Sequence, residues 1–498
     1  MKKCLKLISL LMAFILLSMC IGCSKTEKTS SDNVVIKWVM PGPGKQQDYD
    51  KVMTEFNKKL QDYMPGVTLE IETFPWNEYA QKILLMQTSG EKVDIINTAP
   101  LSFGTEVSKG SFMDITQLVE EKCKDLKEIY VDYMWDYTSV GGKIYAVPSD
   151  QGICRTYGIY VPKDLSDKYW DTEKAEEILL SNNTMTEECY DVIEEYLAAV
   201  KASGDMRKGM QESAQYAFKG YEAFFGDFGV RLDDEKCEVV YLYDTPEMKL
   251  FIEKMSDWYK KGYIRKDALS SYQEQKYIGS ETGYIMWLGS SHKDPGKTAT
   301  MMYGFDIDNA ELFKKYVGYN NANAGGNAVA ASCKNPDKAV ELLNLVNSNK
   351  DMYRLLVYGI EGDHYVKESE SRAKLEYKGG NPSSSERYGI WGYAVGNVFL
   401  GFEDETTPEG WYEYLADLPN NVEVKSNLIG FIPDSSSFTS EATQISSIRK
   451  EFAPSLIAGV YEDYESRYNE FIKKVKQAGV DTVKAELQKQ VNAYLASK

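Results

Sequence analysis

After the amino-terminal segment, stretches with the hydrophobic pattern of strands alternate with stretches that have the pattern of helices. Strands are predicted at 34–40, 67–71 and 93–96, where the residues are mostly apolar or alternate with polar ones. Between the strands, Val52, Phe56 and Leu60 recur every four residues, and a second helical pattern covers 76–87. This β-α-β-α-β order predicts a parallel sheet with helices on its faces. We therefore expect ligands to bind at the carboxyl ends of these strands.

The same kind of pattern continues along the middle of the chain. Further strands are predicted at 143–148, 157–161, 283–289 and 328–332, and a further helix at 336–346. The helix begins at Pro336, a residue that suits the first helical position. An α/β protein with more than one sheet follows from this order.

The carboxyl-terminal region, 430–498, ends in two amphipathic helical patterns. Their apolar stripes are Val460, Tyr464, Tyr468, Phe471 and Val475, and then Val480, Val483, Leu487, Val491 and Leu495. Gly479 separates the two stripes. Each stripe is expected to pack against the core of the protein itself, with a partner helix or a membrane surface as the alternative.

The amino terminus has the features of an export signal. Lys2, Lys3 and Lys6 precede an uncharged, mostly apolar run of 15 residues, 7–21. The run is shorter than the roughly 20 residues that span a bilayer. The ending Cys20-Ile21-Gly22-Cys23 resembles the lipobox of bacterial lipoproteins, although Cys20 stands where Leu is usual. We expect a signal peptide at 1–22, an acylated Cys23 and a flexible tether at 23–33.

Length and charge exclude several classes of function. Without residues 1–22 the chain has 476 residues, which suggests two or three domains, and a formal charge of −21. Such an acidic surface repels nucleic acids and anionic lipids, so nucleic-acid binding is rejected.

Cysteine and histidine usage limits the chemistry further. Beyond Cys23 the cysteines are odd in number, without CxxC spacing, which argues against a disulfide framework or a zinc site. Only His292 and His364 could serve a triad or a His-ligated metal, and neither lies in a catalytic motif. No metal, cofactor or catalytic residue is predicted. In contrast, 36 Tyr, 18 Phe and 8 Trp provide rings for packing or for stacking on sugars.

Four segments together resemble the bacterial family 1 extracellular solute-binding proteins, which include the maltose-binding protein. These segments are 76–96, with Trp opening a helix and Asp94 before a strand; 141–148, Gly-Gly-Lys-Ile-Tyr-Ala-Val-Pro; 279–287; and 335–344. The resemblance covers about residues 34–350. The segment 358–365 and the end from Gly430 are similar to a lipoprotein subgroup with a carboxyl-terminal domain of undescribed function.

The resemblance implies two α/β lobes with a ligand cleft between them. The expected first lobe comprises 34–150 and about 305–350, the second lobe 151–304 and about 351–429, and the helical region 430–498 packs on the lobes. It also implies a sugar or oligosaccharide captured by lobe closure, without catalysis. The partner is then the membrane permease of an ABC importer. We expect a monomer on the outer face of the membrane, held by its lipid anchor alone.

Several candidate ligand-binding residues follow the predicted strands of the first lobe. Trp76 opens a helix after a strand and could offer its ring to a sugar, with packing between the lobes as the alternative. Ser102 and Phe103 occupy the loop after the third strand, where a hydroxyl could bond to a sugar. The resemblance places polar ligand contacts near Lys45.

Other candidates lie where the chain should cross to the second lobe and beyond. Asp150 and Gln151 carry groups that suit sugar hydroxyls. Arg155 could bind a uronic-acid carboxylate or pair with Asp150. The remaining candidates are Trp287 and His292 beside a strand-end turn, and Trp391 in a Gly-spaced aromatic loop.

Two other functions remain open from the sequence. A secreted carbohydrate hydrolase would share an aromatic cleft, but it needs two carboxylates about 5 to 10 Å apart, and none of the acidic residues stands in a recognisable signature. A lipoprotein that binds peptides or acts as an adhesin is the second alternative.

Overall fold

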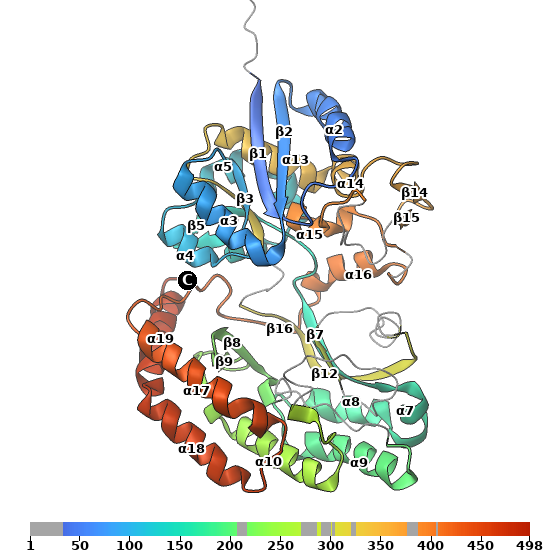
Figure 1. Ribbon diagram of the computed structural model, residues 1–498, viewed down its shortest axis with the longest axis vertical. Coiled ribbons are helices and arrows are strands. Elements are labelled where there is room, and N and C mark those ends of the chain that lie inside the picture. Colours follow the sequence, from blue (N-terminus) through green and yellow to red (C-terminus); the bar gives the residue numbers. More distant parts are fainter. Residues whose placement is uncertain are drawn as a thin grey trace, which may run out of the picture.

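Two sheets form the centres of two lobes, stacked along the long axis of the molecule (Figure 1). The computed structural model describes residues 33–206, 217–269, 286–289, 300, 304–319, 325–375, 387–404 and 407–498, with the backbone alone for 155, 156 and 286–289. The predicted signal, tether and Cys23 therefore lie outside the described residues.

The first lobe has a five-stranded sheet in the order β2-β1-β3-β13-β6. Its strands are β1 (Val34–Pro41), β2 (Val67–Phe74), β3 (Ile95–Asn97), β6 (Ala146–Pro148) and β13 (Gly326–Val329). The predicted parallel arrangement of the first three strands is confirmed, since β1 runs parallel to β2 and to β3. Strand β13 then lies antiparallel between β3 and β6. The carboxyl ends of β1, β2 and β3 thus meet at one edge.

Side chains of β1 alternate between the two faces of this sheet. Trp38 and Met40 enter one hydrophobic core and Val39 the other. The first core is covered by α2 (Tyr49–Tyr63), α5 (Thr116–Lys122), α6 (Lys124–Ile129), α13 (Pro336–Ser348) and α14 (Lys350–Tyr358). The other is covered by α3 (Trp76–Ser89) and α4 (Phe103–Ser108). The first lobe is therefore a sheet between two helical layers.

The second lobe has a four-stranded sheet, β11-β7-β12-β16, and a three-stranded antiparallel sheet, β10-β9-β8. The strands of the larger sheet are β7 (Arg155–Pro162), β11 (Met286–Gly289), β12 (Ile307–Val317) and β16 (Val424–Lys425). Those of the smaller one are β8 (Tyr221–Phe225), β9 (Phe228–Arg231) and β10 (Val240–Tyr241). The helices of this lobe are α7 (Lys163–Tyr169), α8 (Thr172–Ser181), α9 (Glu187–Ser203) and α10 (Pro246–Lys261).

Two of the expected domain boundaries differ in the structure. Strand β12 was expected in the first lobe, yet it pairs antiparallel with β7 in the second. Residues 351–402 were expected in the second lobe, yet α14 and the segment after it pack into the first. The reason is burial: every residue of α14 from Met352 to Tyr358 is buried in that lobe, and Arg354 binds the carbonyl of Leu400.

The chain crosses between the lobes several times: the first crossing joins β6 to β7, and the second joins β12 to β13. The crossings share a small hydrophobic cluster. Its buried members are Cys154, Val317, Leu415, Leu418 and Ile429. Helix α16 (Trp411–Asp417), which carries Leu415, lies between the lobes in Figure 1. These crossings are the hinge about which the lobes can move.

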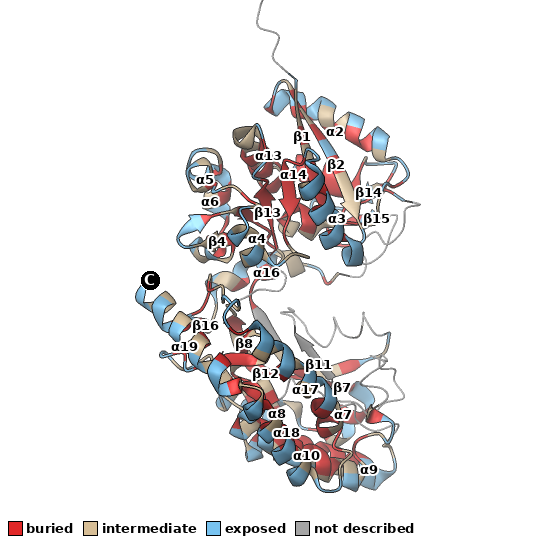
Figure 2. Ribbon diagram, turned by 60° about the vertical axis from the view of Figure 1, so that its left-hand side comes forward, coloured by how far each residue is buried: buried red, intermediate tan, exposed pale blue. Residues whose placement is uncertain are grey.

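The carboxyl-terminal region ends in the two predicted helices, and a third helix precedes them. They are α17 (Thr439–Ile457), α18 (Tyr464–Gln477) and α19 (Val480–Ala496). The predicted stripes are buried against the second lobe at Tyr468, Phe471, Val475, Val483 and Leu487, within the core that contains α9 and α10. Figure 2 shows the result as a buried interior in each lobe.

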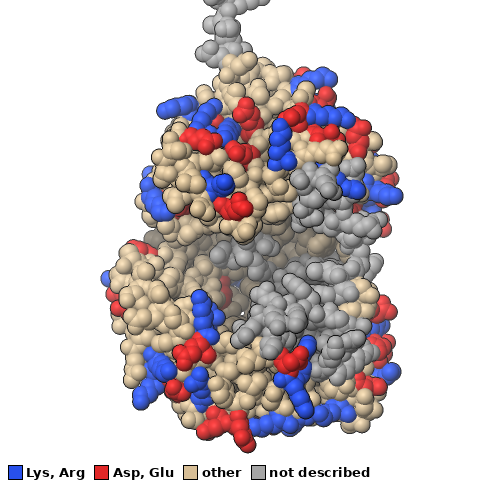
Figure 3. All heavy atoms as spheres, in the orientation of Figure 1, with Lys and Arg blue, Asp and Glu red and all other residues tan. Residues whose placement is uncertain are grey.

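Charged side chains of both signs are spread over both lobes on the face shown in Figure 3. The five cysteines of the described part, Cys123, Cys154, Cys189, Cys237 and Cys333, are buried and free.

Candidate functional site

An exposed aromatic group lies beside the carboxyl end of β2, at the edge of the first-lobe sheet where the carboxyl ends of β1, β2 and β3 meet. Trp76 begins α3 directly after Pro75, and its side chain is 48% exposed. Its ring lies 6.4 Å from that of Tyr393, which stacks on Trp391 at 5.6 Å with 28° between the planes. The structure thus brings together two predicted residues, Trp76 and Trp391, and adds Tyr393. A large, solvent-accessible ring held by neighbouring rings is a surface on which a sugar can stack.

Buried amides hold this aromatic group in place. Tyr393 belongs to the short helix α15 (Gly392–Val395), whose carbonyls accept hydrogen bonds from the side-chain amides of Asn97 and Asn327 at 3.0 to 3.1 Å. The indole of Trp38 in β1 donates to Asn327 at 3.0 Å. Since these amides lie on β3 and β13, the sheet itself fixes the position of the rings.

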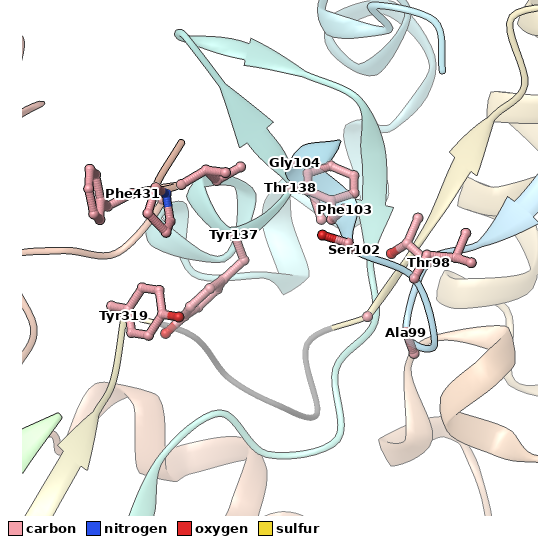
Figure 4. A pocket seen from close by; sticks show the side chains of 14 residues that line it. Thr98, Ala99, Ser102, Phe103, Gly104, Tyr137, Thr138, Tyr319 and Phe431 are labelled. Atoms are coloured by element: carbon pink, nitrogen blue, oxygen red, sulfur yellow. The ribbon is translucent and has the colours of Figure 1, made fainter. Parts of the chain in front are cut away.

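A cavity of about 410 Å³ lies at the other end of the same edge, between the lobes (Figure 4). The first lobe contributes the loop after β3 and α4, Tyr137 with Thr138, and Gly325. Tyr319 from the second crossing and the segment 430–433 form the rest of its lining. The hydroxyl of Tyr137 donates to the carbonyl of Gly318 at 2.6 Å, so this ring is held beside Tyr319. We refer to this space as the inner cavity.

Ser102 and Phe103, the candidates from the loop after the third strand, line the inner cavity. The Ser102 hydroxyl lies 2.9 Å from that of Thr105. Phe103 stacks on Phe112 at 6.0 Å, which fixes the start of α4. In Figure 4 the Ser102 oxygen points toward the open space, where it can exchange its partner for a ligand hydroxyl.

Asp150 is a buried residue of the first crossing. Its carboxylate accepts from the N–H of Gly152 at 3.2 Å, and burial raises the pKa of Asp150 to about 6. Its backbone bonds to Gly396 and Val398, which follow the aromatic segment 391–393. Asp150 therefore connects the hinge with the aromatic group, while the neighbouring Gln151 is half-buried.

Of the remaining candidates, Lys45 is not brought to either feature, and the side chains of the other three are not described. Lys45 is exposed and pairs with Asp50 at 2.9 Å, with its ammonium 5.6 Å from the ring centre of Tyr49. Arg155 and Trp287 belong to β7 and β11, where only their backbone is described. His292 lies outside the described residues. The pairing of Asp150 with Arg155 is therefore still a prediction.

Family comparison agrees with this two-lobe geometry. The model described as bacterial extracellular solute-binding protein matches residues 51–358, more than half of the chain. The chain belongs to this family of bacterial extracellular solute-binding proteins. A second model, a domain of unknown function (DUF3502), matches residues 427–496. The predicted family and its carboxyl-terminal domain are thereby confirmed.

Individual relatives match this solute-binding protein over nearly its full length. A carbohydrate ABC transporter substrate-binding protein of Streptococcus pneumoniae is 25% identical over 490 residues, which cover 96% of this chain and 94% of the relative. The crystal structure of the N-glycan transport solute binding protein (NgtS) from the same species has a TM-score of 0.74 and 22% identity, covering 93% of this chain and 99% of that one. An extracellular solute-binding protein from Bifidobacterium longum subsp. infantis has a TM-score of 0.57 and 15% identity, with 94% and 100% covered. The predicted fold is confirmed.

Membership of the family establishes a protein that binds a solute rather than transforming it, outside the cytoplasm. Among the residues that the structure describes, no helix combines the length and the apolar character needed to cross a membrane. Nor do these residues contain a cluster of three His, Cys, Asp or Glu side chains suited to a metal ion.

Sequence reasoning missed several residues of the solute-binding protein's site. These are Tyr137, Tyr319, Tyr393, Phe431 and Ile432. For Tyr393 a signal existed, because the loop that contains it also contains Trp391 and was recognised as aromatic. The others come from separate crossings, and no local pattern indicates that they meet.

Proposed function

We propose that this solute-binding protein captures a sugar or an oligosaccharide outside the cell and delivers it to the membrane permease of an ABC importer. The observation that carries the proposal is the exposed aromatic group of Trp76, Tyr393 and Trp391 on the same sheet edge as the inner cavity. Flat rings bind the apolar C–H faces of sugars, and nearby hydroxyl groups bind their O–H groups.

The names of the relatives support a carbohydrate ligand. The pneumococcal relative is named a carbohydrate ABC transporter substrate-binding protein. Solved complexes of NgtS contain Man1GlcNAc and Man5GlcNAc. A glycan of this kind is therefore the first ligand to test.

Lobe closure would couple capture to delivery. The inner cavity has walls from the first lobe and from the second crossing, so one ligand contacts both sides and favours the closed form. A shift from 1% to 99% closed needs about 5.5 kcal/mol of differential affinity. The apolar hinge cluster around Leu415 and Val317 can remain packed during such a motion.

The proposal includes a lipid anchor on Cys23 and a monomeric protein. A tethered monomer remains close to the permease in the same membrane without crossing it. Mass spectrometry should find a diacylated Cys23 at the mature amino terminus. Replacement of Cys23 by Ser should release the protein into the medium, and the matched replacement of Cys20 should not. Retention of the Cys23→Ser protein in the membrane would contradict the anchor.

Titration calorimetry and tryptophan fluorescence with a panel of oligosaccharides test the central proposal. We expect saturable binding, a change in fluorescence from Trp76 or Trp391, and an unchanged ligand on chromatography afterwards. Binding of peptides but of no sugar would contradict the carbohydrate assignment. Conversion of the oligosaccharide into products would contradict the function of capture alone.

A further inference from the structure

One face of α19 holds a segment, 427–434, that begins with a turn at 427–430 and leads into the cleft. Gln490, Tyr494 and Lys498 recur every four residues and therefore project from the same side of the chain. Each binds backbone atoms: Gln490 both the N–H and the carbonyl of Asp434 at 2.8 Å, Tyr494 the carbonyl of Ile429, and Lys498 the carbonyl of Asn427 at 2.9 Å. The segment is thus fixed at both ends by the carboxyl-terminal domain.

The middle of this segment contacts the first lobe. Ile432 lies so close to the backbone of Gly104 in α4 that a methyl group at Gly104 would overlap it. Phe431 is buried edge-on against Phe224 of the second lobe at 5.5 Å and lies 5.4 Å from the ring of Tyr494. The segment therefore forms a ridge across the space between the lobes.

A second and larger cavity, of about 1170 Å³, lies beyond this ridge; we call it the outer cavity. It shares Gly430, Phe431 and Ile432 with the inner cavity, so the two spaces adjoin along the ridge. One wall is the turn 139–142 of the first lobe, and the opposite wall is α19. Because its walls belong to different lobes, a ligand in the outer cavity contacts both of them.

The size and chemistry of the two cavities suit different parts of one ligand. The inner cavity falls within the range of about 300 to 1,000 Å³ that holds a small molecule, and the outer cavity exceeds it. Ser436, Ser437, Glu486 and Lys489 bring hydroxyl, carboxylate and ammonium groups to the outer cavity. These groups offer donors and acceptors to the hydroxyls of further sugar units.

We propose that the carboxyl-terminal domain builds a second sugar-binding subsite, in which an oligosaccharide passes from the inner cavity over the Phe431–Ile432 ridge into the outer cavity. The inference rests on the proposed function and adds to it the class of ligand, a glycan of several units. The carboxyl-terminal domain then selects ligand length.

Filling the outer cavity tests the subsite. Ala493 is exposed on α19 and lines the outer cavity, whereas Ala485 is exposed on the same helix and lines neither cavity. We would measure the affinity of the full mature chain and of Ala493→Trp and Ala485→Trp for glycans of two to eight units, including Man1GlcNAc and Man5GlcNAc. Thermal unfolding of each variant would accompany the titrations.

We expect Ala493→Trp to weaken binding of the longer glycans at least tenfold, to leave the shortest binding glycan within twofold, and to unfold at the same temperature as Ala485→Trp. Gln490→Ala, which frees Asp434, should have the same length-dependent effect in weaker form. Equal affinities of Ala493→Trp and Ala485→Trp for the longer glycans would overturn the subsite while leaving the proposed function intact. Failure of the unmodified protein to bind any glycan of the panel would overturn both.

Discussion

The first lobe completes its core with α13 and α14, which return to it after the chain has passed through the second lobe. The second lobe instead shares one continuous core with α17, α18 and α19, from Ile159 to Val491. The domain of unknown function is therefore part of the folding unit of the second lobe. The same helices that complete this lobe also contribute a wall of the outer cavity.

The two surfaces that we propose bind the ligand are supported in different ways. In the first lobe, amides of the sheet fix the rings of Tyr393 and Trp391 from beneath. On the other side, side chains of α19 bind the backbone of a segment with no regular structure of its own. The first surface depends on the sheet, whereas the second depends on one helix.

The largest expected effect comes from removing α17, α18 and α19. Truncation after residue 436 would remove the apolar faces of three helices from the shared core and expose the second-lobe surface that they cover. The loss exceeds the whole stability of a typical domain, about 5 to 15 kcal/mol. Hydrogen exchange should show an unfolded second lobe beside a protected first-lobe sheet. Native-like protection of α9 and α10 in the truncated protein would show that the cores are separable.

A matched pair of core substitutions tests whether the two lobes unfold separately. Phe452 in α17 stacks on Phe471 at 5.6 Å, and Phe56 in α2 is equally buried in the first lobe. Each change to Ala should cost about 3 to 5 kcal/mol. In hydrogen exchange, Phe452→Ala should lower protection in α9 and α10, and Phe56→Ala in β1 and β2. Equal loss in both lobes from either variant would mean that the lobes unfold as one unit.

Glu222 should make the stability of the second lobe depend on pH. Burial raises the pKa of Glu222 from 4.5 to about 7, although Ser426 and the N–H of Tyr319 donate to its carboxylate. Between these values the folded protein keeps a proton that the unfolded chain has released, so stability falls as the pH rises from about 4.5 to about 7. The full decrease is about 3 kcal/mol.

Glu222→Gln should remove this decrease and make the protein more stable than the unmodified one at pH 8, as measured by urea unfolding. Asp150→Asn is the matched control at the hinge, because its pKa of about 6 centres its contribution at lower pH than that of Glu222. Between pH 6 and 7 the slope should change more in the Glu222 variant than in the Asp150 variant. If stability fell with pH as steeply in Glu222→Gln as in the unmodified protein, Glu222 would not be the source of the pH dependence.

Local sequence patterns identified the elements that bury one clear face. Strand β1, helix α3 and the loop with Ser102 were predicted from the spacing of apolar residues and from the Gly and Pro residues that end each element. Strand β12 did not, because its register shifts twice against β7 and its buried residues do not alternate. Helix α14 is buried from Met352 to Tyr358, Arg354 included, so the apolar pattern of this short helix did not reveal which lobe covers it. Tyr319 and Phe431 meet Ser102 only through the crossings, a long-range arrangement that no window of sequence contains.

The smallest expected effect concerns ligand binding at the first-lobe surface. Trp76→Ala should weaken glycan binding by about 1 to 3 kcal/mol, the amount expected for a large stacked ring in a binding site. Because Trp76 is half exposed, the melting temperature should change little. Leu84→Ala is the control, since Leu84 is also an exposed apolar residue of α3, at 55%, two turns farther from the strand end. Calorimetry that found equal affinities for these two variants would remove Trp76 from the site and leave the ligand to the cavities on either side of Phe431.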